Sequence, residues 1–243
     1  MDVQNSVRSV DRALAILDSF SEKHRALSLA QIAKKVSLPT TTTLRILTTL
    51  EQNGFVLKDS ANGTYSLGWK LAKLGNIAFA GLDVCTVAYP YIEQMHAKYN
   101  ESFGLYVAEG KERICVARID STHSFRQCVT IGSSRPLDTG AAGHVLLAFL
   151  KTPIVDEILK YSTCTTPKLL EKTRKDMYSI SYGEYIPGLT SVAAPVFNHD
   201  GTIAAALFVT GPDVRISPLL EEYIEIIKSN AESISLQMGY GKE

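Results

Sequence analysis

A run of hydroxyl side chains joined by one guanidinium is the part of this sequence best suited to a defined chemistry. Thr40, Thr41 and Thr42 are followed by Arg45 and, about one turn of a helix later, by Thr49. Hydroxyls can bond phosphates and base edges, and an arginine can reach a phosphate or the O6 and N7 atoms of guanine. Because consecutive β-branched threonines are a poor choice for helix stability alone, the run predicts contact with nucleic acid.

The sequence around these hydroxyl and arginine side chains predicts helices separated by a tight turn. Apolar residues at helical spacing predict a first helix over about 9–20. Ser28 can cap the next helix, with Gln31 three residues later as in a capping box. Pro39 disfavours helical geometry at the residue before it and so separates that helix from a third, over about 40–52. We expect the third helix to bury three leucines: Leu44, Leu47 and Leu50.

Two short stretches after the third helix predict a β-hairpin. Residues 55–58 and 64–67 read as strands, and the turn over 59–63 has hairpin chemistry. Three helices followed by a hairpin make a winged helix-turn-helix. We expect DNA contacts from the recognition helix, from the cap of the second helix and from the hairpin tip: Ser28, Thr40, Thr41, Thr42, Arg45, Thr49 and Asn62.

The same pattern leaves a second interpretation open. Winged helices sometimes dock proteins, so the chain could be a small-molecule binding protein whose winged helix binds a protein partner. Salt dependence separates the two hypotheses, because DNA binding weakens steeply and linearly with the logarithm of salt concentration.

Composition indicates a globular protein with two domains. Of its 243 residues, 45% are apolar and 21% are charged. No run of about 18 apolar residues and no secretory signal occurs, so we expect a cytoplasmic protein without a membrane partner. Residues 1–75 carry ten Lys or Arg against six Asp or Glu, whereas residues 76–243 carry fifteen against nineteen. A basic N-terminal part joined to an acidic C-terminal part is compatible with nucleic-acid binding by the N-terminal part.

Sequence signals for catalysis, metals and cofactors are missing. Glycine-rich phosphate loops, the G-x-S-x-G pattern and the H-E-x-x-H pattern do not occur. The five histidines lack ligand spacing, and the four cysteines are too widely spaced for a zinc site or a disulfide framework: Cys85, Cys115, Cys128 and Cys164. We therefore expect reduced structural cysteines, and neither an enzyme, a bound metal nor a cofactor.

The rest of the chain predicts a connecting helix and an α+β domain. A stripe at helical spacing runs through 69–85, and Pro90 is expected to kink or restart the helix that follows. Beyond it, the pattern predicts an antiparallel sheet with helices around it. The expected strands cover 103–108, 113–119, 127–131, 190–197 and 202–210, and a helix covers 139–150. Ser217 and Pro218 are expected to open the last helix as N-cap and first residue.

Nearly the whole chain resembles the IclR-type transcriptional regulators. The segments that carry the resemblance are VRSVDRALAILDSF, LSLAQIAKKVSLPTTTTLRILTTLEQNGFV and YSLGWKLAKLG in the first half, and GSSRPLDTGAAGHVLLAFL and AAPVF…DGTIAAALFVTGP in the second. The resemblance implies a winged helix-turn-helix over 1–68, a linker helix over 69–84 and a GAF-like effector-binding domain over 85–243. The family's usual basic residue at the start of the recognition helix is replaced by Thr40, and its usual Lys by His144.

The resemblance also implies where an effector would bind. The start of the helix after Thr139 carries small residues, and such a terminus leaves amides free for an anion. We expect the pocket to be lined by Tyr106, Gly140, Ala141, Ala142, Ser181, Leu189, Ser191, Phe208 and Thr210. Ser181 falls near where some members have an acid, and Phe208 where some have a small polar residue. These differences predict a more apolar pocket than one built for a two-carbon acid.

Taken together, these patterns predict a sequence-specific transcriptional regulator, a repressor rather than an activator. Its partners would be double-stranded operator DNA, a small organic acid, aliphatic or aromatic, and further copies of the chain in a dimer or a dimer of dimers.

Overall fold

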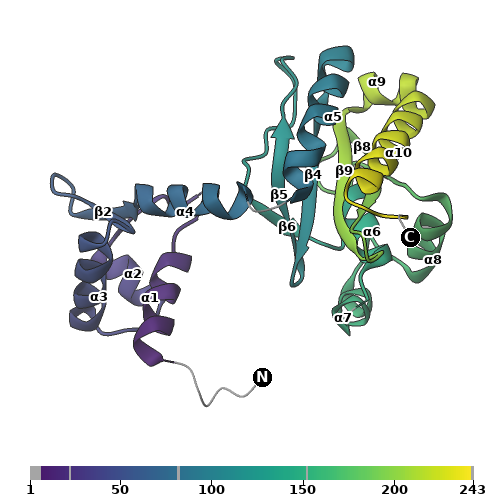
Figure 1. Ribbon diagram of the computed structural model, residues 1–243. Coiled ribbons are helices and arrows are strands. Elements are labelled where there is room, and N and C mark those ends of the chain that lie inside the picture. The colour runs from purple at the N-terminus through teal and green to yellow at the C-terminus, as the bar shows by residue number, and fades with distance from the viewer. Residues whose placement is uncertain (1–6, 22, 81–82, 152, 242–243) are drawn as a thin grey trace. The chain divides into compact units, whose positions relative to one another are not determined.

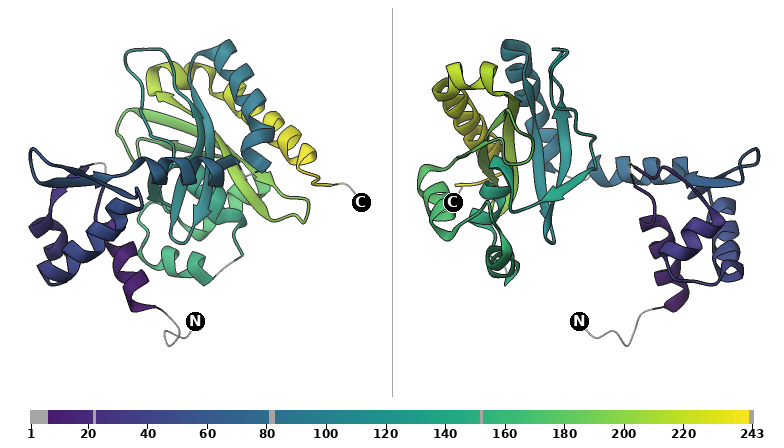
Figure 2. Two further views of the ribbon diagram at one scale, coloured as in Figure 1. Left: turned by 60° about the vertical axis from the view of Figure 1, so that its left-hand side comes forward. Right: turned by 180° about the vertical axis from the view of Figure 1, so that it is seen from behind.

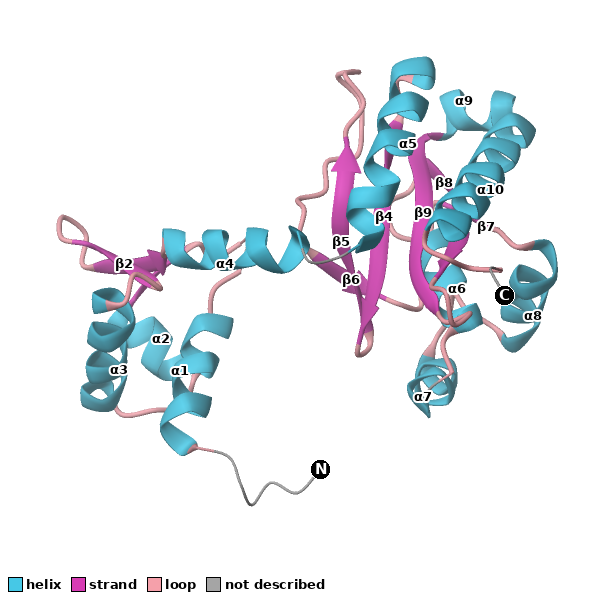
Figure 3. Ribbon diagram, in the orientation of Figure 1, coloured by secondary structure: helices cyan, strands magenta, loops and turns pink. Residues whose placement is uncertain are grey.

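The computed structural model describes residues 7–21, 23–80, 83–151 and 153–241 (Figure 1). The chain divides into two compact units, residues 1–79 and 80–243. Figure 3 shows the same elements by type, with helices and a small sheet in the first unit and a larger sheet among helices in the second.

Three helices, a three-stranded sheet and, after them, the helix α4 make up the described part of the first unit. The helices are α1 (Arg8–Asp18), α2 (Leu29–Lys35) and α3 (Thr40–Gln52), followed by the hairpin of β2 (Val56–Asp59) and β3 (Thr64–Leu67). A short strand that the sequence did not predict, β1 (Ala26–Ser28), pairs with β3, so that the order is β1-β3-β2 with antiparallel pairs. α4 (Trp69–Ala80) follows the hairpin. The core residues include Ile16, Phe20, Leu27, Ile32, Leu47, Leu50, Val56 and Tyr65.

The buried face of α3 differs from the prediction. Leu47 and Leu50 are buried as expected, but Leu44 is 41% exposed and Thr43 takes the inner position. At about 100° per residue, Leu44 lies about 120° around the helix from Leu50, outside the stripe that Thr43, Leu47 and Leu50 form. Thr43 satisfies its hydroxyl by donating to the carbonyl of Pro39 at 3.1 Å. The expectation for Leu44 was therefore wrong.

A six-stranded antiparallel sheet forms the centre of the second unit, in the order β6-β5-β4-β9-β8-β7. Its strands are β4 (Ser102–Glu109), β5 (Glu112–Ile119), β6 (Ser134–Pro136), β7 (Ser179–Tyr182), β8 (Leu189–Phe197) and β9 (Ile203–Pro212). α5 (Asp83–Tyr99) and α10 (Leu220–Gln237) lie on one face of the sheet, and α6 (Gly140–Phe149) lies on the other (Figure 1, Figure 2). α7 (Pro153–Tyr161) and α8 (Pro167–Asp176) follow α6.

Two expectations for the second unit were wrong, and one of the two alternatives for Pro90 is excluded. Residues 127–131 form no strand, because the backbone of Cys115 on β5 bonds Gly132 and Ser133 instead, so that pairing begins further along the chain and leads into β6. α5 continues through Pro90 without restarting. Ser217 opens a 3-10 turn (Ser217–Leu219) after the short helix α9 (Asp213–Ile216), and the N-cap of α10 is Leu219.

Candidate functional site

The outer face of α3 carries the polar side chains that the sequence predicted. Thr40, Thr41, Arg45 and Thr49 are exposed, and Thr42 is half-buried. Thr49 donates its hydroxyl to the carbonyl of Arg45 at 3.1 Å, which leaves that oxygen only as an acceptor. Arg12 on α1, which sequence reasoning missed, lines a shallow hollow together with Thr42, Arg45 and Thr49. A cluster of two guanidiniums and several hydroxyls suits a phosphate backbone and base edges.

Ser28 and Asn62 have structural partners of their own. Ser28 forms the predicted capping box: its amide donates to Gln31 Oε1 at 2.8 Å, and its hydroxyl accepts from the amide of Gln31 at 3.4 Å. Asn62 donates to Asp59 Oδ2 at 2.7 Å within the hairpin turn. This contact and the amide of Ala61 hold the pKa of Asp59 below its usual value, the amide having the larger effect. A role for Ser28 or Asn62 toward DNA stays a prediction.

In the second unit, the fold brings all nine predicted effector residues around one pocket. The pocket lies between the start of α6 and the strands β4, β7, β8 and β9. The antiparallel register explains this, because Ser181 on β7 pairs with Ser191 on β8, and Ser191 pairs with Thr210 on β9. These three hydroxyls therefore form one row across the sheet, and Ser191 Oγ donates to Thr210 Oγ1 at 2.8 Å. The rings of Tyr106 and Phe208 lie beside the row in a tilted arrangement, with centroids 4.8 Å apart.

Two arginines in the same pocket were missed by sequence reasoning. Arg113 on β5 is only 5% exposed. Its Nη1 donates to the carbonyls of Pro136 and Thr139, and its guanidinium lies 5.2 Å from the ring centroid of Tyr106. Burial lowers the pKa of Arg113, whose Nε has no partner among the described residues. Arg113 lies on the same face of β5 as Cys115, but a bulge in the pairing of β4 with β5 shifts the alternation of faces, so the sequence alone did not give the phase of this strand.

Arg135 on β6 is the second arginine of the pocket. Its Nη1 donates to the carbonyl of Ser134 at 2.7 Å, and its guanidinium lies 5.2 Å from the ring centroid of Tyr185. Its Nε is buried and, like that of Arg113, has no partner in the described parts of the chain. No periodicity pointed to Arg135, because the preceding strand was expected at 127–131. The two guanidiniums add positively charged groups to the lining that the sequence analysis did not include.

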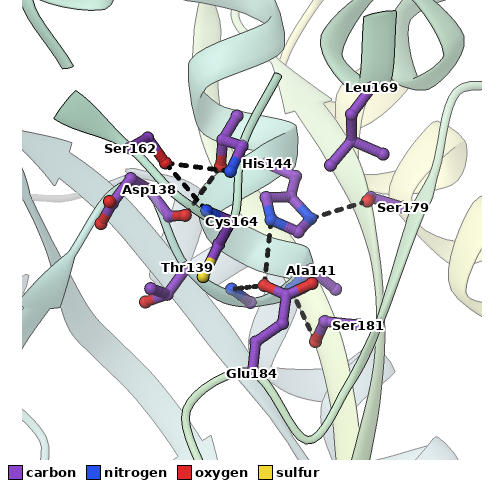
Figure 4. A network of polar contacts seen from close by, with 12 residues as sticks. Asp138, Thr139, Ala141, His144, Ser162, Cys164, Leu169, Ser179, Ser181 and Glu184 are labelled. Atoms are coloured by element: carbon purple, nitrogen blue, oxygen red, sulfur yellow. Dashed lines mark hydrogen bonds and ion pairs between the residues drawn. The ribbon is translucent and has the colours of Figure 1, made fainter. Parts of the chain in front are cut away.

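The first amides of α6 are bound by side chains of the protein itself (Figure 4). The amide of Gly140 donates to Glu184 Oε2 at 2.7 Å, and the amide of Ala141 donates to Ser181 Oγ at 3.0 Å. The turn into the helix depends on Gly140, whose φ of +74° lies in the left-handed region. The expectation that these two amides are free for a ligand was therefore wrong, and Glu184 was missed.

Glu184 is also paired with a buried histidine. His144 Nε2 lies 3.1 Å from Glu184 Oε2, and its Nδ1 lies 3.2 Å from Ser179 Oγ (Figure 4). Burial raises the pKa of Glu184. The hydrogen bonds from His144 and Gly140 and the charge of Arg113 outweigh it, so the pKa lies below its ordinary value. The carboxylate is thus held in its ionised form at the start of α6.

Comparison with known proteins places this architecture in a family. The family model described as "Bacterial transcriptional regulator IclR C-terminal" matches residues 77–236, and the "IclR helix-turn-helix domain" matches residues 9–60. The chain belongs to the IclR family. IclR-family proteins are DNA-binding transcriptional regulators with a C-terminal effector-binding domain, not enzymes, and this chain is one of them.

Relatives of this IclR-family chain cover nearly its whole length. It is 30% identical to the HTH-type transcriptional regulator KipR of Bacillus subtilis, over 98% of this chain and 100% of KipR. It is 28% identical to the HTH-type transcriptional repressor AllR of Klebsiella pneumoniae, over 97% of this chain and 92% of AllR.

Solved structures show the same fold. An IclR transcriptional regulator from Alicyclobacillus acidocaldarius matches with a TM-score of 0.82 and 28% identity, over 96% of this chain and 100% of that one. An IclR homologue from Microbacterium hydrocarbonoxydans, solved as a complex with 4-hydroxybenzoate, matches with a TM-score of 0.81 and 21% identity, over 95% of this chain and 98% of that one.

No helix in the described ranges has both the length and the apolar character needed to cross a membrane. The described residues also contain no group of His, Cys, Asp and Glu that could hold a metal ion.

Proposed function

We propose that this regulator binds operator DNA through the outer face of α3 and that a small organic acid in the pocket beside α6 modulates this binding. The observation that carries the effector half is the pair of guanidiniums, Arg113 and Arg135, each with a buried, unpartnered Nε among the described residues. The lining holds two guanidiniums and one carboxylate, that of Glu184, so one positive charge is left for an anionic ligand to pair with.

The DNA half rests on the polar surface of α3 and on the family. Arg45 and the three threonines at the helix start project from the second helix of a helix-turn-helix, which in this motif lies in the major groove. Because AllR is named a repressor, we infer that this chain too represses transcription. As a DNA-binding regulator it would act in the bacterial cytoplasm.

Self-association would present two recognition helices to one operator. Val10 and Leu14 lie one turn apart on α1 and are each more than half exposed, as are Trp69 and Ile77 on α4. Apolar side chains of this size suit a contact with a second copy. A symmetric dimer then places its recognition helices in successive major grooves, about 34 Å apart, of a near-palindromic operator. The same reasoning extends to a dimer of dimers.

The size of the pocket favours a compact acid. Its volume is about 50 Å³. A cavity needs roughly 10–15 Å³ of such volume to hold one water, so this pocket holds only a few non-hydrogen atoms. A larger aromatic acid would require Tyr185 and Ile186 to move, and both side chains are exposed. The Microbacterium homologue, which has the same fold, was solved with an aromatic acid bound, 4-hydroxybenzoate.

The DNA half is tested by salt titration of an operator selected in vitro from random DNA. We expect the Arg45→Gln variant to bind more weakly than the wild type and to have a shallower log-salt slope, by about one for each phosphate that is no longer neutralised. The matched control is Lys168→Gln, which removes one positive charge from an exposed site on α8 in the second unit. Absence of DNA affinity at low salt would contradict the proposal and favour a protein partner.

The effector half is tested by thermal shift against butyrate, benzoate and their neutral amides. A ligand that binds only the folded state stabilises by about 2.7 kcal/mol at 100 times its dissociation constant. We expect at least one acid to raise the melting temperature and its amide to have no effect. If neither acid shifts the melting temperature, or each amide acts as strongly as its acid, an organic-acid effector is contradicted.

A further inference from the structure

The charges that line the pocket do not balance among themselves. Arg113 and Arg135 contribute two positive charges, and Glu184 contributes one negative charge. Arg118, a buried arginine outside the lining, is paired with the carboxylate of Asp120. Among the described residues, the lining therefore carries one uncompensated positive charge.

Glu184 is fixed in place as part of the pocket wall. Its Oε2 accepts from the amide of Gly140 at 2.7 Å and lies 3.1 Å from His144 Nε2. A carboxylate at this point occupies the place at the N-terminus of α6 that would otherwise attract an anionic ligand. The protein supplies this anion itself, so a ligand carboxylate has to bind elsewhere in the pocket.

The arginines offer the remaining anion-binding positions. The guanidinium of Arg113 faces the start of α6, since a Cβ atom on Gly140 would lie 3.3 Å from its Nη2. Its Nε and that of Arg135 are buried donors without partners in the described chain. A carboxylate presents two acceptor oxygens and suits two such donors.

We propose that the pocket selects a compact monocarboxylate, which Arg113 and Arg135 bind, and that Glu184 serves as a built-in counter-anion that excludes dicarboxylates. The proposal rests on the proposed function of the pocket as an effector site. One negative charge from the ligand balances the pocket, whereas a second would face Glu184 with no cation left to pair with it. Like-charge juxtaposition of this kind is a strong basis for rejecting a ligand.

Three probes of similar size test the charge rule: butyrate with one carboxylate, succinate with two, and butyramide with none. Dissociation constants are measured by isothermal titration calorimetry with the full chain at about pH 8, where the carboxylates of the probes are ionised. For the wild type we expect butyrate to bind at least about tenfold more tightly than succinate or butyramide, as expected for one unpaired charge in the pocket. Succinate binding as tightly as butyrate would overturn the proposal.

The Glu184→Gln variant tests the counter-anion directly. A glutamine keeps an oxygen to accept from the amide of Gly140 but removes the negative charge, so the helix start retains its cap. We expect the preference to shift toward succinate by about tenfold or more, because the lining then carries two positive charges. The control Glu221→Gln makes the same change at an exposed site on α10 and should leave the preference unchanged. An unchanged preference in a folded Glu184→Gln variant would contradict the counter-anion role.

The arginines are tested separately from folding. Arg135→Gln should weaken butyrate binding at least about tenfold, since a charged donor is removed, while Lys168→Gln, an exposed change of the same charge, should not. Arg113→Lys keeps the charge and should retain part of the affinity that Arg113→Gln abolishes. If butyrate binding weakens in the arginine variants but the preference is unchanged in Glu184→Gln, only the charge rule fails. If none of the acids binds the wild type, the proposed effector site fails with it.

Discussion

At the scale of single residues, Glu184 links the stability of the second unit to its ligand chemistry. The carboxylate accepts from the amide of Gly140 and faces His144, and these contacts favour its ionised form. Burial raises the pKa of Glu184, but the hydrogen bonds and neighbouring charges outweigh it, and the pKa lies below that of a free glutamate. The residue therefore stabilises the folded state only while it is ionised.

This lowered pKa predicts a pH dependence of stability. The contribution of Glu184 is fully present above the unfolded-state pKa of about 4.3 and is lost as the pH falls through the lower folded-state value. Melting temperatures measured from neutral pH down to about pH 3 should therefore fall more steeply for the wild type than for Glu184→Gln. Glu221→Gln should follow the wild type. Parallel curves for the wild type and Glu184→Gln would show that the carboxylate has no preference for its ionised form in the fold.

At the scale of elements, close approach of the backbone positions the arginine side chain. Gly143 lies inside α6, and a Cβ atom there would lie 2.3 Å from the carbonyl oxygen of Leu137 and 2.8 Å from Arg113 Nη1. Only a glycine lets the helix start pack this tightly against the guanidinium. Gly75, inside α4, has nothing within 4 Å of the same position.

These two glycines form a matched pair for mutagenesis. Gly143→Ala should lower the free energy of unfolding by about 1–3 kcal/mol through overpacking and should weaken butyrate binding. Gly75→Ala should be neutral or stabilising by up to about 1 kcal/mol, because alanine favours the helix and meets no obstacle. Chemical denaturation measures both. A Gly143→Ala variant as stable as the wild type with unchanged butyrate affinity would contradict this packing argument.

A second prediction at this scale concerns the capping box of α2. Ser28→Ala removes the side-chain oxygen that accepts from the amide of Gln31 and should cost about 1 kcal/mol of stability in the first unit. Ser21→Ala, a change of the same kind at an exposed residue outside the helices, should cost less. Equal losses of stability from the two variants in urea denaturation would contradict a stabilising role of the cap.

The sequence predicts elements well where a local signal is strong. The bounds of α3 matched because Pro39 and Asn53-Gly54 mark its ends, and the pocket residues were found through the family resemblance. Arg113, Arg135 and Glu184 were not, because their positions depend on non-local pairing. The phase of β5, the true start of β6 and the loop after β7 are set by the sheet as a whole. The prediction that Leu44 is buried was wrong for a simpler reason. Leucines spaced three residues apart are compatible with either of two neighbouring faces of a helix.

At the scale of the whole molecule, the exposed apolar side chains of α1 and α4 predict association of copies. Leu14→Ser and Ile77→Ser each remove an exposed apolar side chain from the first unit and should weaken self-association in analytical ultracentrifugation. Operator affinity should fall together with self-association, because the two recognition helices of a dimer contact the same operator at once. Val214→Ser, at a 79% exposed site in the second unit, is the control. Unchanged association in both variants would place the interface elsewhere.

We propose that a small carboxylic acid held by the two pocket arginines controls DNA binding. The most direct measurement is a titration of the selected operator complex with butyrate, followed by fluorescence anisotropy, for the wild type and Arg135→Gln. We expect butyrate to change the operator affinity of the wild type by about 5- to 150-fold, the usual range of allosteric coupling, and to leave that of the variant nearly unchanged. An operator affinity that is the same with and without saturating butyrate in the wild type would contradict the account.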